Sequence, residues 1–139
     1  MSSTIYMLDT NTVSYIIKGD TVIKSRLSDV AMSSIHISTI TEAELLRGVA
    51  RKPEAKHLPL LVKEFLLRVN ILPWDSEAAK SYANLRTACE SDGYSLGAMD
   101  MLIAAHSVAV KATLITNDKA FYNVERHLLL EDWSKPVGH

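Results

Sequence analysis

The sequence predicts one α/β domain in which helices cover both faces of a central parallel sheet. Short apolar runs alternate along the chain with longer segments of helical periodicity, an order typical of parallel sheets. Strands this short and apolar, set between helices, indicate a parallel sheet that is covered on both faces. The chain has 139 residues, 47% of them hydrophobic, and this is sufficient for a single core spanning residues 1–139.

The first half of the chain contains two predicted strands and four predicted helices. In order, they are a strand at 5–8, helices at 11–18 and 21–31, a strand at 35–38, and helices at about 41–51 and at 57–69. Gly19 ends the first of these helices. Pro59 is compatible with the last of them only in its first turn.

The second half contains short strands around two long helices. A very short strand at 71–72 precedes a helix that Asp75 can cap and Gly93 ends, and whose apolar positions recur at helical spacing: Ala78, Ala79, Tyr82, Leu85 and Cys89. A helix at 97–110, a strand at 113–116 and a last strand at 128–130 follow.

Four acidic residues lie where these elements meet. They are Asp9 directly after strand 5–8, Glu44 in the first turn of helix 41–51, Asp100 near the start of helix 97–110, and Asp118 shortly after strand 113–116. Since parallel sheets bind ligands beyond the carboxyl ends of their strands, we expect the four to lie together. Clustered carboxylates repel one another unless a cation or a shared proton is present. A hard divalent cation such as Mg²⁺ would resolve the repulsion and could promote phosphodiester cleavage.

Each acid also has a structural interpretation. Asp9, Glu44 and Asp118 could cap helices, because acids are common at helix N-termini. Capping alone does not explain why several caps should gather at one edge of a sheet. The polar neighbours of two of these acids, which are Thr10, Asn11, Thr116 and Asn117, could orient carboxylates or serve as ordinary turn residues.

Four segments resemble the acidic motifs of PIN domains. They are MLDTN at 7–11, ITEAELLRG at 40–48, DMLIAAH at 100–106 and TNDKAF at 116–121, and EDW at 131–133 is also similar. Their order and spacing cover nearly the whole chain and are more specific than any single motif. The pattern is similar to that of the VapC-type toxins of bacterial toxin–antitoxin pairs.

The resemblance implies a three-layer PIN-like fold and an endoribonuclease that requires Mg²⁺ or Mn²⁺. By position, Asp9, Glu44, Asp100 and Asp118 correspond to the acidic quartet that holds the metal and performs catalysis. It further implies cleavage of structured RNA, with tRNA as the first candidate. A homodimer and silencing by a small VapB-type antitoxin, which inserts a segment near the active site, are also implied.

Glu42 departs from the family pattern, because relatives usually carry an apolar residue at that position. Helix phase places Glu42 on the apolar side of its helix, and capping boxes could be formed by Thr39 with Glu42 or by Thr41 with Glu44. The motif register favours Glu44, which precedes Gly48 by four residues as the family's acid does.

Charge and composition exclude other classes of protein. With 15 Lys and Arg against 16 Asp and Glu, the chain is not a histone-like or strongly basic nucleic-acid binder. The lone cysteine, Cys89, excludes an intramolecular disulfide and a cysteine zinc cluster, and suits a reducing cytoplasm. The sequence shows no signal peptide and no apolar stretch long enough to span a bilayer, so we expect no membrane association.

Several other residues have two interpretations. We expect His106, Trp74 and Trp133 to pack in the interior. The apolar segment 60–67 is interpreted as core, with a partner groove as the alternative. The basic edge formed by Arg47, Arg51 and Lys52 fits phosphate binding and a solvated helix end equally well.

Two other functions compete with the ribonuclease interpretation. An aspartate-nucleophile phosphatase would explain Asp9 after a strand, but it usually needs a second acid two residues later, where Asn11 stands, and a longer chain. An inactive PIN-like module that only binds an antitoxin would be favoured by a broken quartet, whereas the quartet here is intact.

Overall fold

The computed structural model describes residues 3–136 and contains a five-stranded sheet in which every pairing is parallel. The strand order is β3-β2-β1-β4-β5, which places β1 at the centre. The strands are β1 Tyr6–Leu8, β2 Ile35–Ser38, β3 Asn70–Leu72, β4 Thr113–Ile115 and β5 Leu130–Glu131. The predicted parallel sheet is therefore confirmed.

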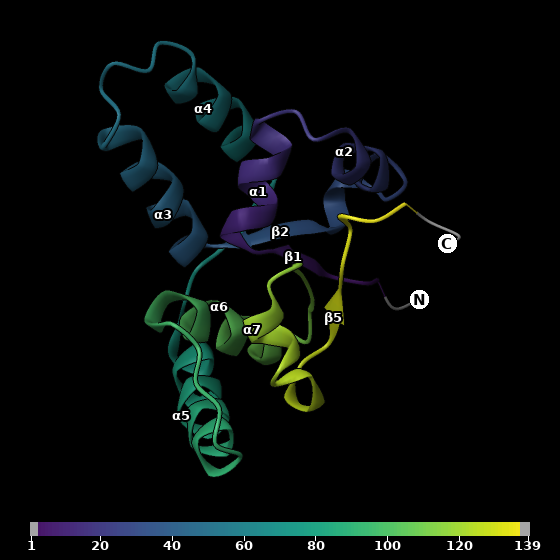
Figure 1. Ribbon diagram of the computed structural model, residues 1–139, viewed down its shortest axis with the longest axis vertical. Helices are drawn as coiled ribbons and strands as arrows, with labels where there is room; N and C mark the ends of the chain where they lie inside the picture. The colour runs from purple at the N-terminus through teal and green to yellow at the C-terminus, as the bar shows by residue number, and fades with distance from the viewer. Residues whose placement is uncertain (1–2, 137–139) are drawn as a thin grey trace.

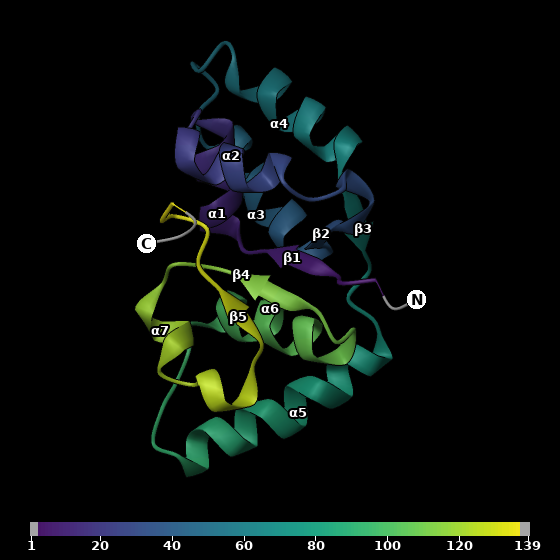
Figure 2. The same ribbon diagram turned by 90° about the vertical axis from the view of Figure 1, so that its right-hand side faces the viewer.

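Helices cover the two faces of the sheet in two groups, as Figures 1 and 2 show from perpendicular directions. One face carries α1 Thr10–Ile17, α2 Thr21–Ser28, α3 Thr39–Ala50 and α4 Leu58–Arg68. The other carries α5 Ser76–Ser91, α6 Ala98–Ala109 and the short α7 Lys119–Tyr122. Short 3-10 helices at Met32–Ser34 and Glu125–His127 precede β2 and β5. The expected three-layer α/β architecture is confirmed.

Alternate residues of the central strands supply the two halves of the core. Met7 and Leu114 are fully buried against α5 and α6, whereas Leu8 and Ile115 are fully buried on the face that carries α1, α3 and α4. Because successive side chains of a strand point to opposite faces, a sheet covered on both sides needs apolar residues at every position. This requirement explains the consecutive apolar pairs Met7–Leu8 in β1 and Leu114–Ile115 in β4.

Helix ends differ from the predicted ones where a cap was misjudged. The structure starts α3 at Thr39, two residues before the predicted start, because the Ser38 hydroxyl accepts a hydrogen bond from the Ile40 amide at 3.0 Å. Neither Thr39 nor Thr41 is therefore the cap, and Glu44 lies in the second turn of the helix, not in its first. The four-residue α7 was missed, because it is too short to show helical periodicity.

Two predictions of burial are partly wrong. In α5, Ala78, Leu85 and Cys89 are buried, but Ala79 is exposed. In segment 60–67, Val62 belongs to the core, whereas Leu60, Leu61 and Leu67 are 57%, 43% and 77% exposed. Among residues 3–136, no helix is both long enough and apolar enough to cross a membrane.

Candidate active site

The strand order defines where a ligand can bind. From the central β1 the chain continues to β2 on one side, while β4 pairs with β1 on the other. The crevice outside the carboxyl ends of β1 and β4 is thus the switch point at which open parallel sheets bind ligands. Asp9 follows β1 directly, and Asp118 follows β4 by three residues, so both acids flank this crevice.

Asp9 is held rigidly at the end of β1. Its backbone amide donates to the Ile115 carbonyl at 3.1 Å, and its Oδ1 atom accepts a hydrogen bond from the Thr12 amide at 2.8 Å. The side chain is 2% exposed. Burial raises the pKa of Asp9, and the charge of Asp118 raises it further, while hydrogen bonds from Thr116 and Thr12 oppose this shift. Asp9 is therefore both a helix cap and a buried member of the acidic cluster.

Asp118 combines the same two roles. Its Oδ1 atom caps α7 by accepting from the Ala120 amide at 2.9 Å, and its own amide donates to Thr116 Oγ1 at 3.1 Å. A cap uses only part of the capacity of a carboxylate, which can accept about four hydrogen bonds. The capping interpretation is confirmed for Asp9 and Asp118, and it does not exclude a further function.

Glu44 is not a cap, so the capping interpretation is wrong for this residue. It reaches the site from the second turn of α3, where its Oε1 atom accepts a hydrogen bond from the Thr10 hydroxyl at 2.5 Å. The same hydroxyl lies 3.4 Å from Thr41 Oγ1. Thr10, the residue after Asp9, therefore ties α1 to α3 and orients the Glu44 carboxylate toward the crevice.

Asp100 lies in the first turn of α6, which Gly97 caps without a side-chain hydrogen bond. Burial raises the pKa of Asp100 to about 6, and the charges of Asp118, Asp9 and Glu44 all contribute in the same direction. The three other predicted carboxylates thus lie close enough to Asp100 to disfavour its ionised form, although the four residues come from four separate parts of the chain.

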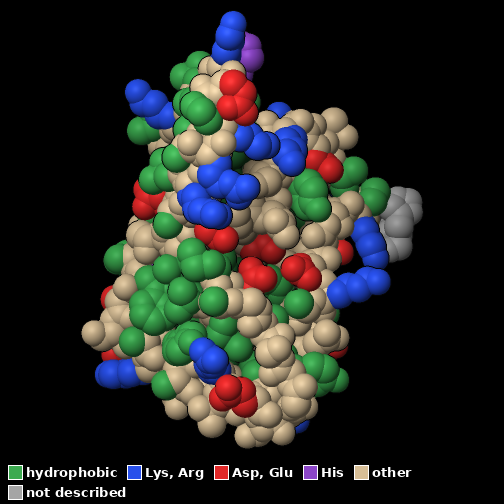
Figure 3. All heavy atoms as spheres, turned by 60° about the vertical axis from the view of Figure 1, so that its left-hand side comes forward, with side chains coloured by type: hydrophobic (Ala, Val, Ile, Leu, Met, Phe, Trp, Pro, Cys, Tyr) green, Lys and Arg blue, Asp and Glu red, His purple; other side chains and the backbone are tan. Residues whose placement is uncertain are grey.

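The site has the chemistry of a divalent cation site. The four clustered side chains offer only carboxylate oxygens, the ligands that Mg²⁺ and Mn²⁺ prefer. Figure 3 shows acidic side chains gathered in a recess of one face, with Lys and Arg side chains bordering it on one side. Within residues 3–136, no three acidic, histidine or cysteine side chains form a ready-made cation cage. Mg²⁺ does not require such a cage, because it commonly binds one or two carboxylates and retains several of its waters.

Two supporting residues went unnoticed in the sequence. The Thr12 hydroxyl donates to the Ile115 carbonyl at 3.0 Å and thereby fixes the start of α1 to β4. Ser38, besides capping α3, has its hydroxyl 2.8 Å from Nδ1 of His106 on α6. Both contacts join residues more than 60 positions apart, so no local sequence pattern could predict them.

His106 is 1% exposed, which confirms the expected interior position. Burial lowers the pKa of His106, and the charge of Asp75 opposes this only in part. A neutral ring whose Nδ1 atom accepts the Ser38 proton fits both facts. The pair links α3, which carries Glu44, to α6, which carries Asp100.

The tryptophans also have structural roles, as expected. Trp133 is 2% exposed and packs at 5.3 Å from Tyr6, and its indole N–H donates to Glu131 at 3.0 Å. The indole N–H of Trp74 donates to the Leu102 carbonyl at 2.9 Å.

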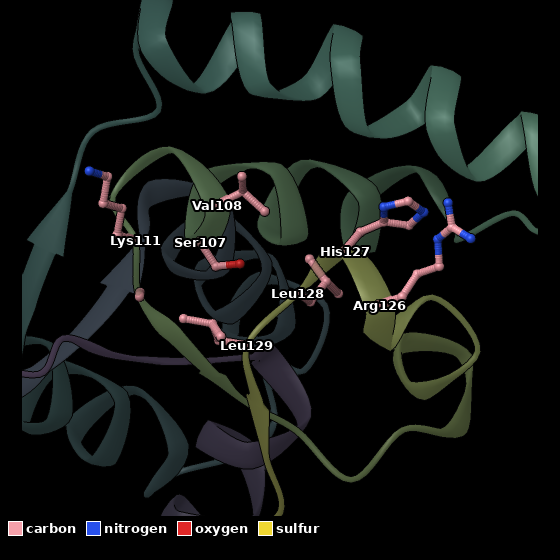
Figure 4. A pocket seen from close by; sticks show the side chains of 8 residues that line it. Ser107, Val108, Lys111, Arg126, His127, Leu128 and Leu129 are labelled. Atoms are coloured by element: carbon pink, nitrogen blue, oxygen red, sulfur yellow. The ribbon is translucent and has the colours of Figure 1, made fainter.

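A second hollow lies at the opposite edge of the sheet, beside the amino end of β4 (Figure 4). Lys111 and Arg126 border it, but Figure 4 shows them at opposite ends, where their charges do not converge. Arg126 instead pairs with Asp92 at 3.3 Å. This hollow contains no acid of the predicted quartet.

Comparison with known proteins agrees with this geometry. Residues 6–127 match the PIN domain family. The chain is 36% identical to "Ribonuclease VapC2" of Rickettsia felis, over 94% of this chain and 99% of the relative. It is 26% identical to "tRNA(fMet)-specific endonuclease VapC" of Shigella flexneri, over 93% and 98% of the two chains. The crystal structure of VapBC2 from Rickettsia felis, bound to a DNA fragment from its promoter, superposes with a TM-score of 0.86 at 35% identity over 94% of this chain and 99% of that one. The chain therefore belongs to the PIN domain family, and within that family to the VapC ribonucleases.

Proposed function

We propose that this protein cleaves structured RNA in a reaction that depends on Mg²⁺ or Mn²⁺, and that it is the toxin of a toxin–antitoxin pair. The observation that carries the proposal is the quartet Asp9, Glu44, Asp100 and Asp118, whose charges converge at the switch point of the sheet. A bound divalent cation would neutralise this charge, polarise a phosphodiester and acidify a water molecule.

The residues of the chain have distinct tasks in this proposal. Asp9, Asp100 and Asp118 hold the cation, and Glu44 completes the acidic set from α3. Thr10 orients Glu44, and Thr12 and Thr116 keep the Asp9 carboxylate in place through hydrogen bonds. The ionised form of Asp100 is needed to bind the cation, and the cation in turn favours that form over the protonated one.

The proposed substrate is tRNA, because a relative that matches nearly the whole chain is named for cleavage of tRNA(fMet). The phosphatase alternative is disfavoured by the family match, and the inactive alternative by the intact quartet.

Metal removal provides the first test. Incubation with tRNA and Mg²⁺ should give discrete cleavage products, and excess EDTA should abolish cleavage because the proposed ligands are all carboxylates. Added Mn²⁺ should restore the products. Gel analysis of end-labelled tRNA measures the rate, and sustained cleavage in EDTA would exclude the proposed mechanism.

An antitoxin would need a surface to bind, and the exposed leucines of α4 provide one. A groove of about 500 Å³ lies between α1, α2 and α4. Its apolar lining includes Ile17, Leu27, Leu61 and Phe65. We propose that a VapB-type antitoxin covers this groove, since related chains crystallise as VapBC complexes. The toxin is proposed to be a homodimer within such a complex.

Leu61→Glu tests this surface. The charge should weaken binding of the antitoxin encoded beside the toxin by about 10- to 100-fold, because a leucine that the antitoxin would cover is replaced by a carboxylate that must be desolvated. Cells that express this variant should stay arrested when the antitoxin is co-expressed. Leu67→Glu, on the same helix but outside the groove, should be silenced normally. If the antitoxin silences both variants equally, it does not bind in the groove between α1, α2 and α4.

A further inference from the structure

A small pocket adjoins the acidic site and shares two of its residues. It lies between α1, α3 and α4, has a volume of about 190 Å³, and includes Thr10 and Glu44 in its lining. Leu45 and Val62 form part of an apolar wall. A group that occupies this space lies beside the Glu44 carboxylate, so the pocket borders the proposed active site on the α3 side.

Gly48 keeps the pocket open. It lies within α3 in ordinary helical geometry, since the positive-φ glycines within residues 3–136 are Gly19 and Gly93. A Cβ atom built on Gly48 would meet nothing within 4 Å. Neither the backbone nor the packing therefore requires glycine here, and glycine weakens a helix relative to alanine. The absence of a side chain at Gly48 instead leaves the pocket in front of it unfilled.

The lining of this Gly48 pocket favours a nucleotide. Lys18 and Lys52 border it, and among residues 3–136 neither lysine forms a salt bridge. Their charges can hold a phosphate at the edge while the apolar wall receives a ring. A cavity of about 150 Å³ accepts one benzene ring, so a pocket of about 190 Å³ has room for one flat base.

We propose that the Gly48 pocket binds the base of the nucleotide next to the scissile phosphate of the RNA substrate, and that Lys18 and Lys52 bind the phosphate of that nucleotide. The proposal rests on the ribonuclease function proposed above. Single-stranded or loop nucleotides can extend their bases into protein pockets, which gives sequence preference beside the cleavage point. The lysines also offset the repulsion between RNA and the acidic recess.

The test combines a pocket-filling variant with a base-deleted substrate. The cleavage site is mapped on tRNA, and a synthetic RNA hairpin carrying it is made intact and with an abasic nucleotide on either side of the cut. Wild type should cleave one of the two abasic hairpins about 10- to 100-fold more slowly in kcat/KM, the usual contribution of a small apolar pocket. Gly48→Leu should cleave the intact hairpin more slowly by a similar factor and should not distinguish it from that abasic hairpin.

Two measurements separate this effect from damage to the protein. Gly48→Leu should melt at or above the wild-type temperature, because leucine favours a helix more than glycine does. Its Mn²⁺ affinity should equal that of wild type. Ala50→Leu, which adds the same side chain at the exposed end of α3, should cleave all hairpins as wild type does.

The remaining outcomes overturn the proposal in distinguishable ways. If wild type cleaves tRNA but treats both abasic hairpins like the intact one, the pocket binds no base. If Gly48→Leu loses antitoxin affinity and keeps full cleavage, the pocket serves a protein partner. Absence of any RNA cleavage by wild type with Mg²⁺ would instead reject the proposed function itself.

Discussion

Asp100→Asn should lower RNA cleavage by about 10²- to 10³-fold and should make the metal-free protein more stable. The loss follows from removing one charged ligand from a site that works by electrostatic stabilisation. The gain follows from the raised pKa of Asp100, which burial and the three other carboxylates move to about 6. One pKa unit corresponds to about 1.4 kcal/mol, but solvent screening of a partly exposed group reduces the effect. We therefore expect the free energy of unfolding to rise by roughly 1 kcal/mol.

The raised pKa of Asp100 predicts that the metal-free protein loses stability as the pH rises. Well below its ordinary pKa of 3.8, Asp100 is protonated in both the folded and the unfolded chain and does not affect stability. As the pH rises from about 4 to 6, the unfolded chain ionises first, so stability falls; above about 6 the full penalty is present. Asp100→Asn should remove this fall. Urea unfolding in EDTA at pH 4.5 and pH 7.5 measures it.

A matched substitution outside the site serves as control. Asp29→Asn, at the exposed end of α2, should keep wild-type cleavage and the wild-type fall in stability between the two pH values. If Asp100→Asn cleaves tRNA at the wild-type rate with Mg²⁺, Asp100 does not belong to the catalytic set.

The general placement of the site was predictable from the sequence for a physical reason. The neighbouring strands β1 and β4 carry buried apolar residues on both faces, so each appears in the sequence as a short apolar run. Parallel pairing brings the carboxyl ends of such strands to one edge of the sheet. Asp9 and Asp118 follow β1 and β4, and these two strands are neighbours in the sheet. The position of these acids could be inferred once the strands were recognised.

The contacts that position the site were not predictable, because they join distant segments. The hydrogen bond between Thr10 and Glu44 spans 34 positions, and the one between Ser38 and His106 spans 68. The start of α3 was misjudged because three hydroxyl residues, Ser38, Thr39 and Thr41, all suit an N-cap. Ser38 is the N-cap of α3 because β2 ends at this residue, and the extent of β2 depends on its pairing with β1 and β3.

Glu44→Gln and Glu42→Gln should have opposite consequences, although the residues are two positions apart. The structure gives Glu44 the hydrogen bond from Thr10 and makes it one of the charges that raise the pKa of Asp100. Glu42, half-buried in the first turn of α3, contributes to neither the Asp9 nor the Asp100 shift. These contacts support the motif register that favours Glu44.

Glutamine at position 44 can still accept the Thr10 proton, so the variant loses charge with little change in shape. We expect Glu44→Gln to lower cleavage by about 10²-fold and to require more Mg²⁺ for half-maximal rate. Glu42→Gln should cleave tRNA normally. Because Ser38 is the cap, no capping box involves Glu42, and its loss should cost only the interaction with the helix dipole, about 0.3–1 kcal/mol. The measurement is the cleavage rate of each variant as a function of Mg²⁺ concentration. If Glu42→Gln is inactive and Glu44→Gln is active, the fourth carboxylate of the site is Glu42 and not Glu44.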